Sequence, residues 1–297
     1  MPEPAHGWIV LDKPRGLGST QAVGAIKRLL RESGEPKTKV GHGGTLDPLA
    51  NGVLPIALGE ATKLAGRMLD ATKDYDFTLS FGTETDTLDT EGEVVATSDV
   101  RPTRAQIHAI LQRFTGPIEQ VPPAFSALKI DGRPAYERAR AGEELAMKPR
   151  EVTVHSLKLS DFNGDTATFS ATVSKGTYIR SLARDIAKAL GTVGHVSMLR
   201  RTRAGPFGLD QAQKLDFLEQ TAKARQLTRV VAPLTAALDD IPALPVTPEQ
   251  ARLLRHGQML FGIPVQPGLR LAMDGETPVA LVEATEGGLK VVRGFNL

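Results

Sequence analysis

The segment Gly41–Pro55 reads GHGGTLDPLANGVLP and places one acidic side chain, Asp47, in a loop rich in glycine and proline. Pro48 fixes its own φ angle and keeps Asp47 out of the helical region. The flanking glycines permit backbone conformations and close approaches that other residues forbid. Such control over a single carboxylate favours a nucleophile that must meet one substrate atom. A tight turn in which Asp47 caps backbone amides is the alternative.

The composition limits the class of protein. The chain has 297 residues, of which 41% are hydrophobic, and this suits one large domain or a large domain with a small one. It contains no cysteine, which excludes disulfides, thiolate metal sites and a cysteine nucleophile. No apolar run reaches membrane-spanning length, and Met1–His6 lacks the basic and apolar regions of a signal peptide. We therefore expect a cytoplasmic protein that does not span a membrane.

Helix and strand signals alternate along the chain without a regular βαβ rhythm. Apolar residues at helical spacing predict helices at 19–30 and 179–190, and a capping box formed by Thr103 and Gln106 begins another helix. Alternating apolar and polar residues predict half-buried strands at 75–81 and 166–173. This mixture indicates an α+β fold with a mixed, largely antiparallel central sheet flanked by helices.

The C-terminal segment has its own pattern. A proline-rich stretch, Ile241–Pro245, predicts a linker, and a short helix follows it. The later short strands are separated by Asp274-Gly275 and Gly287-Gly288, which fits a small β-barrel. We therefore predict a first domain at 1–239 and a second at 240–297, with a β-rich stabilising cap as the alternative for the second.

Basic residues are concentrated in one region of a chain whose formal net charge is only +2. Between Ala171 and Gly205 the only acidic residue is Asp185, whereas the basic residues are Lys175, Arg180, Arg184, Lys188, Arg200, Arg201 and Arg203. One basic region on an otherwise acidic protein is typical of a polyanion-binding surface, and a solvated charged face is the alternative.

The segment Gly41–Pro55 closely resembles the catalytic loop of the TruB family of tRNA pseudouridine synthases, whose motif is G-H-x-G-x-L-D-P. Further blocks match this family in order between Asp12 and about Arg203, and they are Leu11–Gly16, Gly59–Leu64, Lys73–Tyr75, Val121–Lys129 and Lys175–Leu182. Asn51 stands where threonine is expected in many members, although asparagine also suits a loop. The resemblance implies a pseudouridine synthase fold that isomerises uridine in RNA, with uridine 55 in the T loop of tRNA as the target. It also implies a C-terminal RNA-binding domain similar to the PUA type.

The resemblance assigns roles to individual residues. Asp47 corresponds to the nucleophile, Tyr75 to the tyrosine that stacks on the base and takes part in proton transfer, and Arg180 to the arginine that pairs with the aspartate. Tyr178, expected in the same strand end as Arg180, and Leu199 correspond to walls of the uridine pocket.

A second group of residues is expected to contact RNA. His42 corresponds to the histidine that stacks into the RNA loop and helps to extrude the base. Lys129 lies in a segment, about 121–152, that forms a mobile thumb in relatives, and the basic pair Arg200 and Arg201 is expected to bind phosphates. Isomerisation oxidises nothing and imports no group, so we expect no cofactor and no metal. We expect a monomer with tRNA as its partner and no obligatory protein partner.

Four other classes of protein were compared with the sequence as alternatives to a pseudouridine synthase. Gly41–Gly44 resembles the oxyanion loop of esterases, but the sequence lacks a G-x-S-x-G nucleophile elbow. Asp86–Thr90 resembles an aspartyl phosphotransferase motif only superficially, since one residue too many separates its acids. The missing cysteines exclude a zinc base deaminase. A noncatalytic RNA-binding or tRNA-folding protein is the alternative that stays open.

Overall fold

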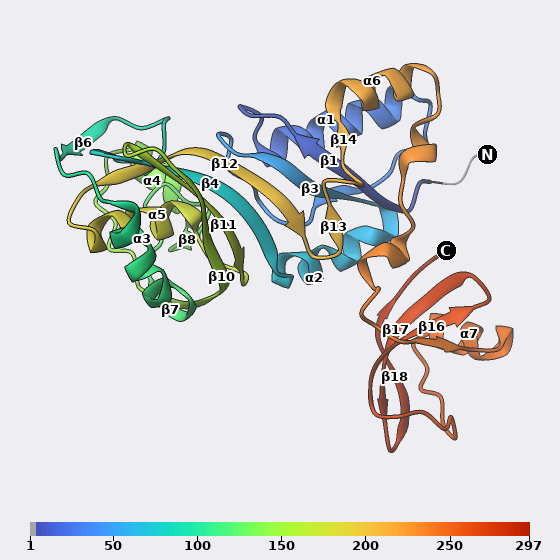
Figure 1. Cartoon of the computed structure of the whole chain (residues 1–297). Helices are drawn as coiled ribbons and strands as arrows, with labels where there is room; N and C mark the ends of the chain where they lie inside the picture. Colours follow the sequence, from blue (N-terminus) through green and yellow to red (C-terminus); the bar gives the residue numbers. More distant parts are fainter. Residues whose placement is uncertain (1–3) are drawn as a thin grey trace.

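The computed structural model describes residues 4–297, and a ten-stranded mixed sheet dominates this part of the chain (Figure 1). Its main order is β14 (Gln213–Lys214), β1 (Gly7–Lys13), β3 (Asn51–Leu58), β12 (Gly194–Ala204), β4 (Lys73–Phe81), β11 (Thr166–Val173), β10 (Arg150–Phe162) and β7 (Gly116–Gln120). Two further strands, β2 (Val40–His42) and β13 (Phe207–Gly208), pair with β3 and β12. Among these described strands only β1–β14 and β3–β12 pair in parallel, which confirms the predicted mixed and largely antiparallel sheet.

Helices cover parts of this sheet. At one end lie α1 (Ser19–Glu32) and α6 (Leu215–Lys223), and at the other lie α3 (Arg104–Ile110) and α5 (Ile179–Ala189) (Figure 1). The shorter elements are η1 (Gly59–Leu64), α2 (Ala65–Asp70), β5 (Thr83–Thr85), β6 (Val94–Thr97), η2 (Leu111–Phe114), η3 (Leu227–Val230) and η4 (Leu234–Ala237). The predicted helices at 19–30 and 179–190 are confirmed as α1 and α5. The predicted capping box is confirmed, because the Thr103 hydroxyl accepts from the N–H of Gln106 and the Gln106 side chain accepts from the N–H of Thr103.

The central strand β4 shows why alternation predicted a half-buried strand. Phe77 and Leu79 are fully buried, and the Phe77 ring stacks on Phe169 of β11 with ring centroids 5.1 Å apart. On the opposite face Thr78 and Thr168 share a hydrogen bond of 2.9 Å. One face of the strand therefore joins the core, and the other carries polar side chains.

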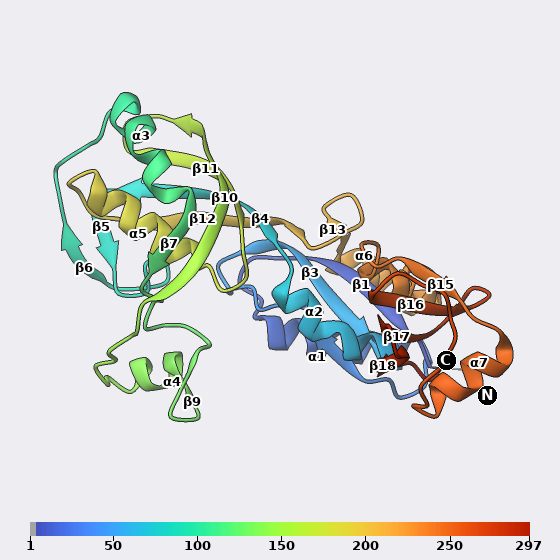
Figure 2. The same cartoon turned by 90° about the horizontal axis from the view of Figure 1, so that it is seen from below.

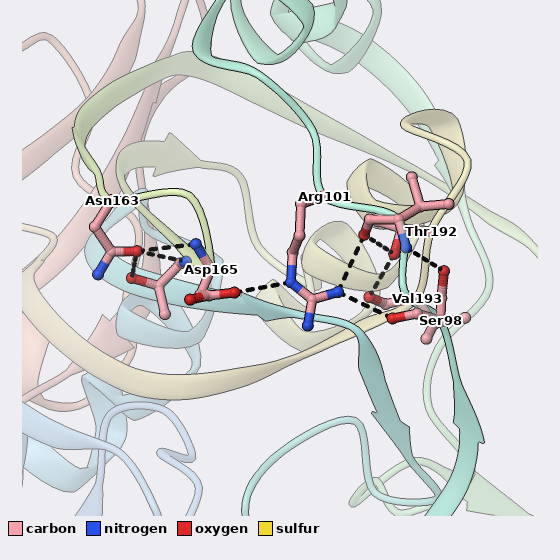
Figure 3. Close-up of polar contacts among 8 residues, drawn as sticks. Ser98, Arg101, Asn163, Asp165, Thr192 and Val193 are labelled. Carbon is pink, nitrogen blue, oxygen red and sulfur yellow. Dashed lines mark hydrogen bonds and ion pairs between the residues drawn. The ribbon is translucent and has the colours of Figure 1, made fainter.

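Polar side chains tie the loops together at the end of the sheet that carries α3 and β6. Figure 3 shows Arg101 between Asp165, which its Nε contacts at 2.9 Å, and the carbonyl oxygen of Ser98. Asn163 accepts hydrogen bonds from the backbone N–H of Asp165 and from the next residue, and the Thr192 hydroxyl donates to the carbonyl of Val100. Because Asp165 is largely exposed, these contacts order loops but add little stability.

An insertion, which we define as residues 121–149, separates β7 from β10. It contains β8 (Lys129–Ile130), β9 (Arg133–Pro134) and α4 (Ala135–Arg140), and Figure 2 shows these elements projecting from the main sheet. Within the insertion, Arg138 forms surface ion pairs with Asp131 and Glu143. The structure places the start of β10 at Arg150, inside the range 121–152 that we predicted for the thumb.

The C-terminal segment forms a second sheet, and two predictions for it need correction. Within residues 4–297 this sheet has four strands in the order β15 (Ala243–Pro245), β16 (Gly268–Asp274), β17 (Thr277–Thr285) and β18 (Gly288–Gly294), with α7 (Pro248–Arg255) beside them. The predicted linker therefore contributes a strand. The predicted barrel is an open sheet. The segment between α7 and β16 makes one bridge to β18, Leu260 to Leu289, and then contains Pro264 and Pro267, which cannot donate to a ladder.

This second sheet shares a hydrophobic core with the main body. Trp8 of β1 packs against Phe207, with ring centroids 5.4 Å apart, and the same cluster includes Leu281 and Phe295 from the C-terminal segment. Lys63 donates to the carbonyl of Gly294 at 2.9 Å. The boundary after residue 239 stays a prediction, but the shared core shows that the two parts stabilise each other. In residues 4–297, no helix is long and apolar enough to cross a membrane.

Candidate active site

A cavity of about 290 Å³ opens beside the Asp47 loop, which we define as residues 43–50. Its lining includes side chains from the loop, from β4, from the start of α5 and from β12, namely Asp47, Lys73, Tyr75, Tyr178, Leu199 and Arg201. Five of the predicted site residues, Asp47, Tyr75, Tyr178, Leu199 and Arg201, therefore meet at one cavity although they are far apart in the sequence.

The backbone around Asp47 is fixed on both sides. The Ser19 hydroxyl, in the first turn of α1, donates to the carbonyl of Leu46 and accepts from its N–H, each at 2.9 Å. After the aspartate, the carbonyl of Pro48 accepts from the N–H of Gly16 at 2.7 Å. The Asp47 side chain itself is 31% exposed, so a rigid loop presents a carboxylate that a substrate can reach.

Arg180 forms an ion pair with the Asp47 carboxylate. Its Nε lies 2.9 Å from Asp47 Oδ2 in an ion pair whose N–H is not aligned for a hydrogen bond. Its other nitrogens donate to the carbonyls of Thr87 and Phe125 at 2.9 and 3.0 Å. The guanidinium is only 5% exposed, and its position is therefore set by several partners at once.

A second carboxylate, that of the buried Asp89, also faces Arg180, with Oδ2 3.5 Å from Nη1. Asp89 Oδ1 accepts from the Thr87 hydroxyl at 2.6 Å and from the N–H of Glu91 at 2.9 Å. Leu88, between these residues, has a left-handed φ of 63°. The sequence of Asp86–Thr90 resembles only a phosphotransferase motif and did not predict this role, because the spacing between acids does not reveal that one of them is buried against a distant arginine.

Arg201 differs from its expected role. It is 1% exposed and donates to the carbonyls of Val53, Thr45 and Gly44, the first at 2.7 Å and the others at 3.2 Å. A guanidinium enclosed by three carbonyls is not available to an RNA phosphate, so the prediction of a phosphate contact is wrong for this residue. Its contacts instead hold the Asp47 loop against β3.

Gly52 makes this arrangement possible. It has a φ of 104°, and a Cβ at this position would lie 2.2 Å from the carbonyl oxygen of Arg201. Strands β3 and β12 pair in parallel here, with Gly52 opposite Arg201. Only glycine permits this close approach.

Two buried lysines complete the surroundings of the loop. Lys13 donates to the carbonyl of Leu17 at 2.6 Å and to that of Pro14 at 3.0 Å, and Lys73 donates to the carbonyls that end α2, Met68, Leu69 and Ala71. Burial lowers the pKa of each lysine to about 8. The motif blocks contained both residues, but nothing in their spacing indicated that the ammonium groups bind backbone carbonyls.

The remaining pocket residues reach the cavity from different elements. Tyr75 is half-buried on β4, and Leu199 of β12 is 5% exposed and pairs in register with Phe77. Tyr178 is the N-cap of α5 and not part of a strand end as predicted, and Arg180 lies in the first turn of the same helix.

The other predicted RNA contacts lie outside the lining of this cavity. His42 ends β2 half-buried, and burial lowers its pKa below the usual value, so the ring is neutral at pH 7. Lys129 is exposed in the insertion, and Arg200 contacts Asp12 at 3.1 Å beside a separate cavity. Within residues 4–297, no group of three or more His, Cys, Asp or Glu side chains could hold a metal ion.

Comparisons with known proteins identify the family of this chain. The family model of TruB family pseudouridylate synthase (N terminal domain) matches residues 27–179, and that of the tRNA pseudouridylate synthase B C-terminal domain matches residues 180–239. The tRNA pseudouridine synthase B of Novosphingobium aromaticivorans is 61% identical, covering 98% of this chain and 97% of the relative. That of Zymomonas mobilis subsp. mobilis is 59% identical, covering 98% and 96%.

A solved structure shares the fold over the same length. A chain in the structure of an H/ACA RNP bound to a substrate RNA containing 2'-deoxyuridine matches with a TM-score of 0.73 and 26% identity, covering 98% of this chain and 86% of that chain. The two family matches together span most of the chain, and the curated relatives align with nearly all of it. The chain therefore belongs to the TruB family of pseudouridylate synthases.

Proposed function

We propose that this protein isomerises uridine to pseudouridine in tRNA and that its target is uridine 55 in the T loop. The observation that carries the proposal is the partly exposed Asp47 carboxylate, which lies at the cavity of about 290 Å³ with Arg180 Nε 2.9 Å from its Oδ2. The curated relatives described above bear the name tRNA pseudouridine synthase B, and they align over nearly the whole chain.

The isomerisation of uridine requires a carboxylate at the reacting atoms and a pocket that keeps the detached base in place. The bond between uracil N1 and ribose C1′ breaks, the base rotates, and C5 bonds to C1′; C5 loses a proton and N1 gains one, so atoms balance. Asp47 supplies the carboxylate for attack at C1′ or C6 or for an assisted elimination. Arg180 orients this carboxylate and balances its charge, while the loop contacts of Ser19 keep it in place.

The walls of the cavity suit a detached base. Tyr75 and Tyr178 offer aromatic faces for stacking, the Tyr75 hydroxyl is a candidate for proton transfer, and Leu199 adds an apolar surface. A base in a stacked RNA loop cannot reach this cavity, so the uridine must be flipped out. In this proposal the neutral ring of His42 fills the gap that the flipped base leaves.

In this proposal, RNA contacts outside the cavity come from exposed or half-buried cations. Lys129 in the insertion and Arg200 beside the loop are the proposed phosphate contacts, and the C-terminal segment adds Arg255, Arg270, Lys290 and Arg293. We further propose that the protein acts as a monomer in the cytoplasm and needs no cofactor. A noncatalytic tRNA-folding role is the competing function, although the paired Asp47 and Arg180 favour catalysis.

The test is incubation with an unmodified tRNA transcript, without added cofactor, followed by mapping of pseudouridine along the RNA. A matched transcript with cytidine at position 55 is the control. We expect pseudouridine at position 55 of the first transcript and none in the second. Modification elsewhere would contradict the T-loop assignment, and tight binding without any pseudouridine would leave the noncatalytic role as the better one.

A further inference from the structure

The two ends of the insertion meet at a wall of the uridine pocket. Gln120 is the last residue of β7 and Arg150 is the first residue of β10, and the two are paired in register. Both side chains contact Tyr178, the N-cap of α5 that lines the cavity with Asp47. The chain thus leaves and re-enters the main sheet beside the same tyrosine.

Gln120 binds the backbone of Tyr178 through both ends of its amide. Its Nε2 donates to the carbonyl of Tyr178 at 3.1 Å, and its Oε1 accepts from the N–H of Tyr178 at 2.7 Å. Gln120 is 1% exposed, so these bonds compete little with water. A buried amide paired in this reciprocal way fixes where α5 begins.

Arg150 holds the ring of the same tyrosine. Its Cζ lies 4.8 Å from the centroid of the Tyr178 ring, and the guanidinium also donates to the carbonyl of Gly176. The side chain lines the cavity at Asp47 and also an adjoining open cavity of about 790 Å³. Arg150 therefore forms part of the partition between these two cavities.

The first residues of the insertion are bound to the same helix. The Ser181 hydroxyl and the Arg184 guanidinium both donate to the carbonyl of Val121, at 2.8 and 3.1 Å. Arg180 donates to the carbonyl of Phe125 and also contacts Asp47. The first two turns of α5 thus connect the root of the insertion to the pocket.

We propose that Gln120 and Arg150 are positioning residues that hold Tyr178 against the uridine pocket and transmit the position of the insertion to it. The inference rests on the proposed function, since it concerns how that pocket is organised. When RNA binds the insertion, part of the binding free energy therefore stabilises the positions of the side chains around the base. Contacts with the insertion should then raise the rate of the chemical step and not only the affinity.

The test is single-turnover pseudouridine formation at saturating enzyme, measured beside the Kd for tRNA, in Gln120→Met and Arg150→Met. Exposed Glu119, the neighbour of Gln120 on β7, gives the control variant Glu119→Gln. We expect each Met variant to lower the saturated rate by roughly 10-fold to 100-fold, with Kd changed by less than about 3-fold. Arg150→Lys, which keeps a cation beside the ring, should recover part of the rate.

A double-mutant cycle separates positioning from general damage to the fold. In a Tyr178→Leu background the ring that Arg150 contacts is gone, so Arg150→Met should lower the rate by less than about 3-fold. Equal effects in the two backgrounds, or variants that lose affinity and rate by the same factor, would overturn the inference. Thermal unfolding of each variant confirms that the folded protein is compared. A wild-type protein that forms no pseudouridine would instead contradict the proposed function itself.

Discussion

The side chains that organise the Asp47 loop are buried cations. Lys13, Lys73 and Arg201 use backbone carbonyls as their main partners, whereas Arg180 divides its contacts between carbonyls and carboxylates. Burial of a charge is costly unless hydrogen bonds satisfy it, so each cation strongly restricts the backbone that surrounds it. The geometry at Asp47 therefore depends on the hydrogen bonds and ion pairs of these buried cations.

The adjacent residues Arg200 and Arg201 allow a test of whether a buried cation holds the Asp47 loop in place. Arg201→Met leaves three carbonyls without their donor and should lower the free energy of unfolding by about 3 kcal/mol or more, because the acceptors stay buried. Arg200→Met removes a partly exposed ion pair with Asp12 and should cost about 1 kcal/mol or less. Urea unfolding of both variants measures the difference. Similar losses in the two variants would show that Arg201 does not hold the loop.

The lowered pKa of Lys73 predicts a pH dependence of stability. Its folded pKa is about 8 and its ordinary value is 10.5, so between these pH values the unfolded chain holds a proton that the folded chain has lost. The free energy of unfolding should therefore rise with pH across this window, by about 1 kcal/mol per pH unit from this group. Urea unfolding at pH 8, 9 and 10 should give a shallower rise for Lys73→Met than for the wild type. Identical slopes would show that the carbonyls at the end of α2 keep Lys73 charged.

Sequence patterns predicted the pocket residues better than the buried cations. Asp47, Tyr75, Tyr178 and Leu199 were predicted by resemblance, and they meet at one cavity. Asp89 and the burial of Arg201 could not be predicted, since a charged side chain in a basic stretch is ordinarily solvated and its burial depends on the pairing of β3 with β12.

At the scale of the elements, the pairing of β3 with β12 positions the site, and a substitution at Gly52 tests this pairing. Gly52→Ala places a Cβ 2.2 Å from the carbonyl oxygen of Arg201 and forces β3 away from β12, so we expect a loss of about 3 kcal/mol or more and a large loss of activity. Gly66→Ala is the matched control, because this glycine is exposed in α2 and its Cβ would meet nothing within 4 Å. It should be neutral or stabilising by up to about 1 kcal/mol. Thermal unfolding compares the two, and a stable Gly52→Ala protein would contradict the role of this close approach.

Helices and strands whose apolar residues recur with a clear period were predicted from the sequence. A strand that forms only by pairing with a neighbouring strand was not. Strands β4 and β11 and helices α1 and α5 follow from apolar spacing alone. The stretch Ile241–Pro245 contains two prolines and was predicted as a linker, yet its residues Ala243–Pro245 pair with β16 as a short edge strand. Proline is tolerated there because an edge strand needs no second ladder, a fact that depends on the finished sheet.

At the scale of the whole molecule, the C-terminal sheet and the main body share one core. Phe295→Ala removes a side chain that is 1% exposed in that core and should lower the free energy of unfolding by about 3 to 5 kcal/mol. Phe261→Ala is the control, since Phe261 is 73% exposed and its loss should be nearly neutral. Calorimetry of both variants gives the comparison. If Phe295→Ala unfolds like the wild type, the shared core contributes little to stability.

The measurement that decides most directly whether Asp47 carries the chemistry is pseudouridine formation by Asp47→Asn on an unmodified tRNA transcript, at saturating enzyme. Asparagine keeps the shape of the side chain but removes the carboxylate, so the rate should fall by at least about 1,000-fold. The Kd for the same tRNA should change by less than about 3-fold, because the RNA contacts proposed outside the cavity remain. A folded Asp47→Asn protein that still forms pseudouridine at a substantial fraction of the wild-type rate would contradict the assignment of this site.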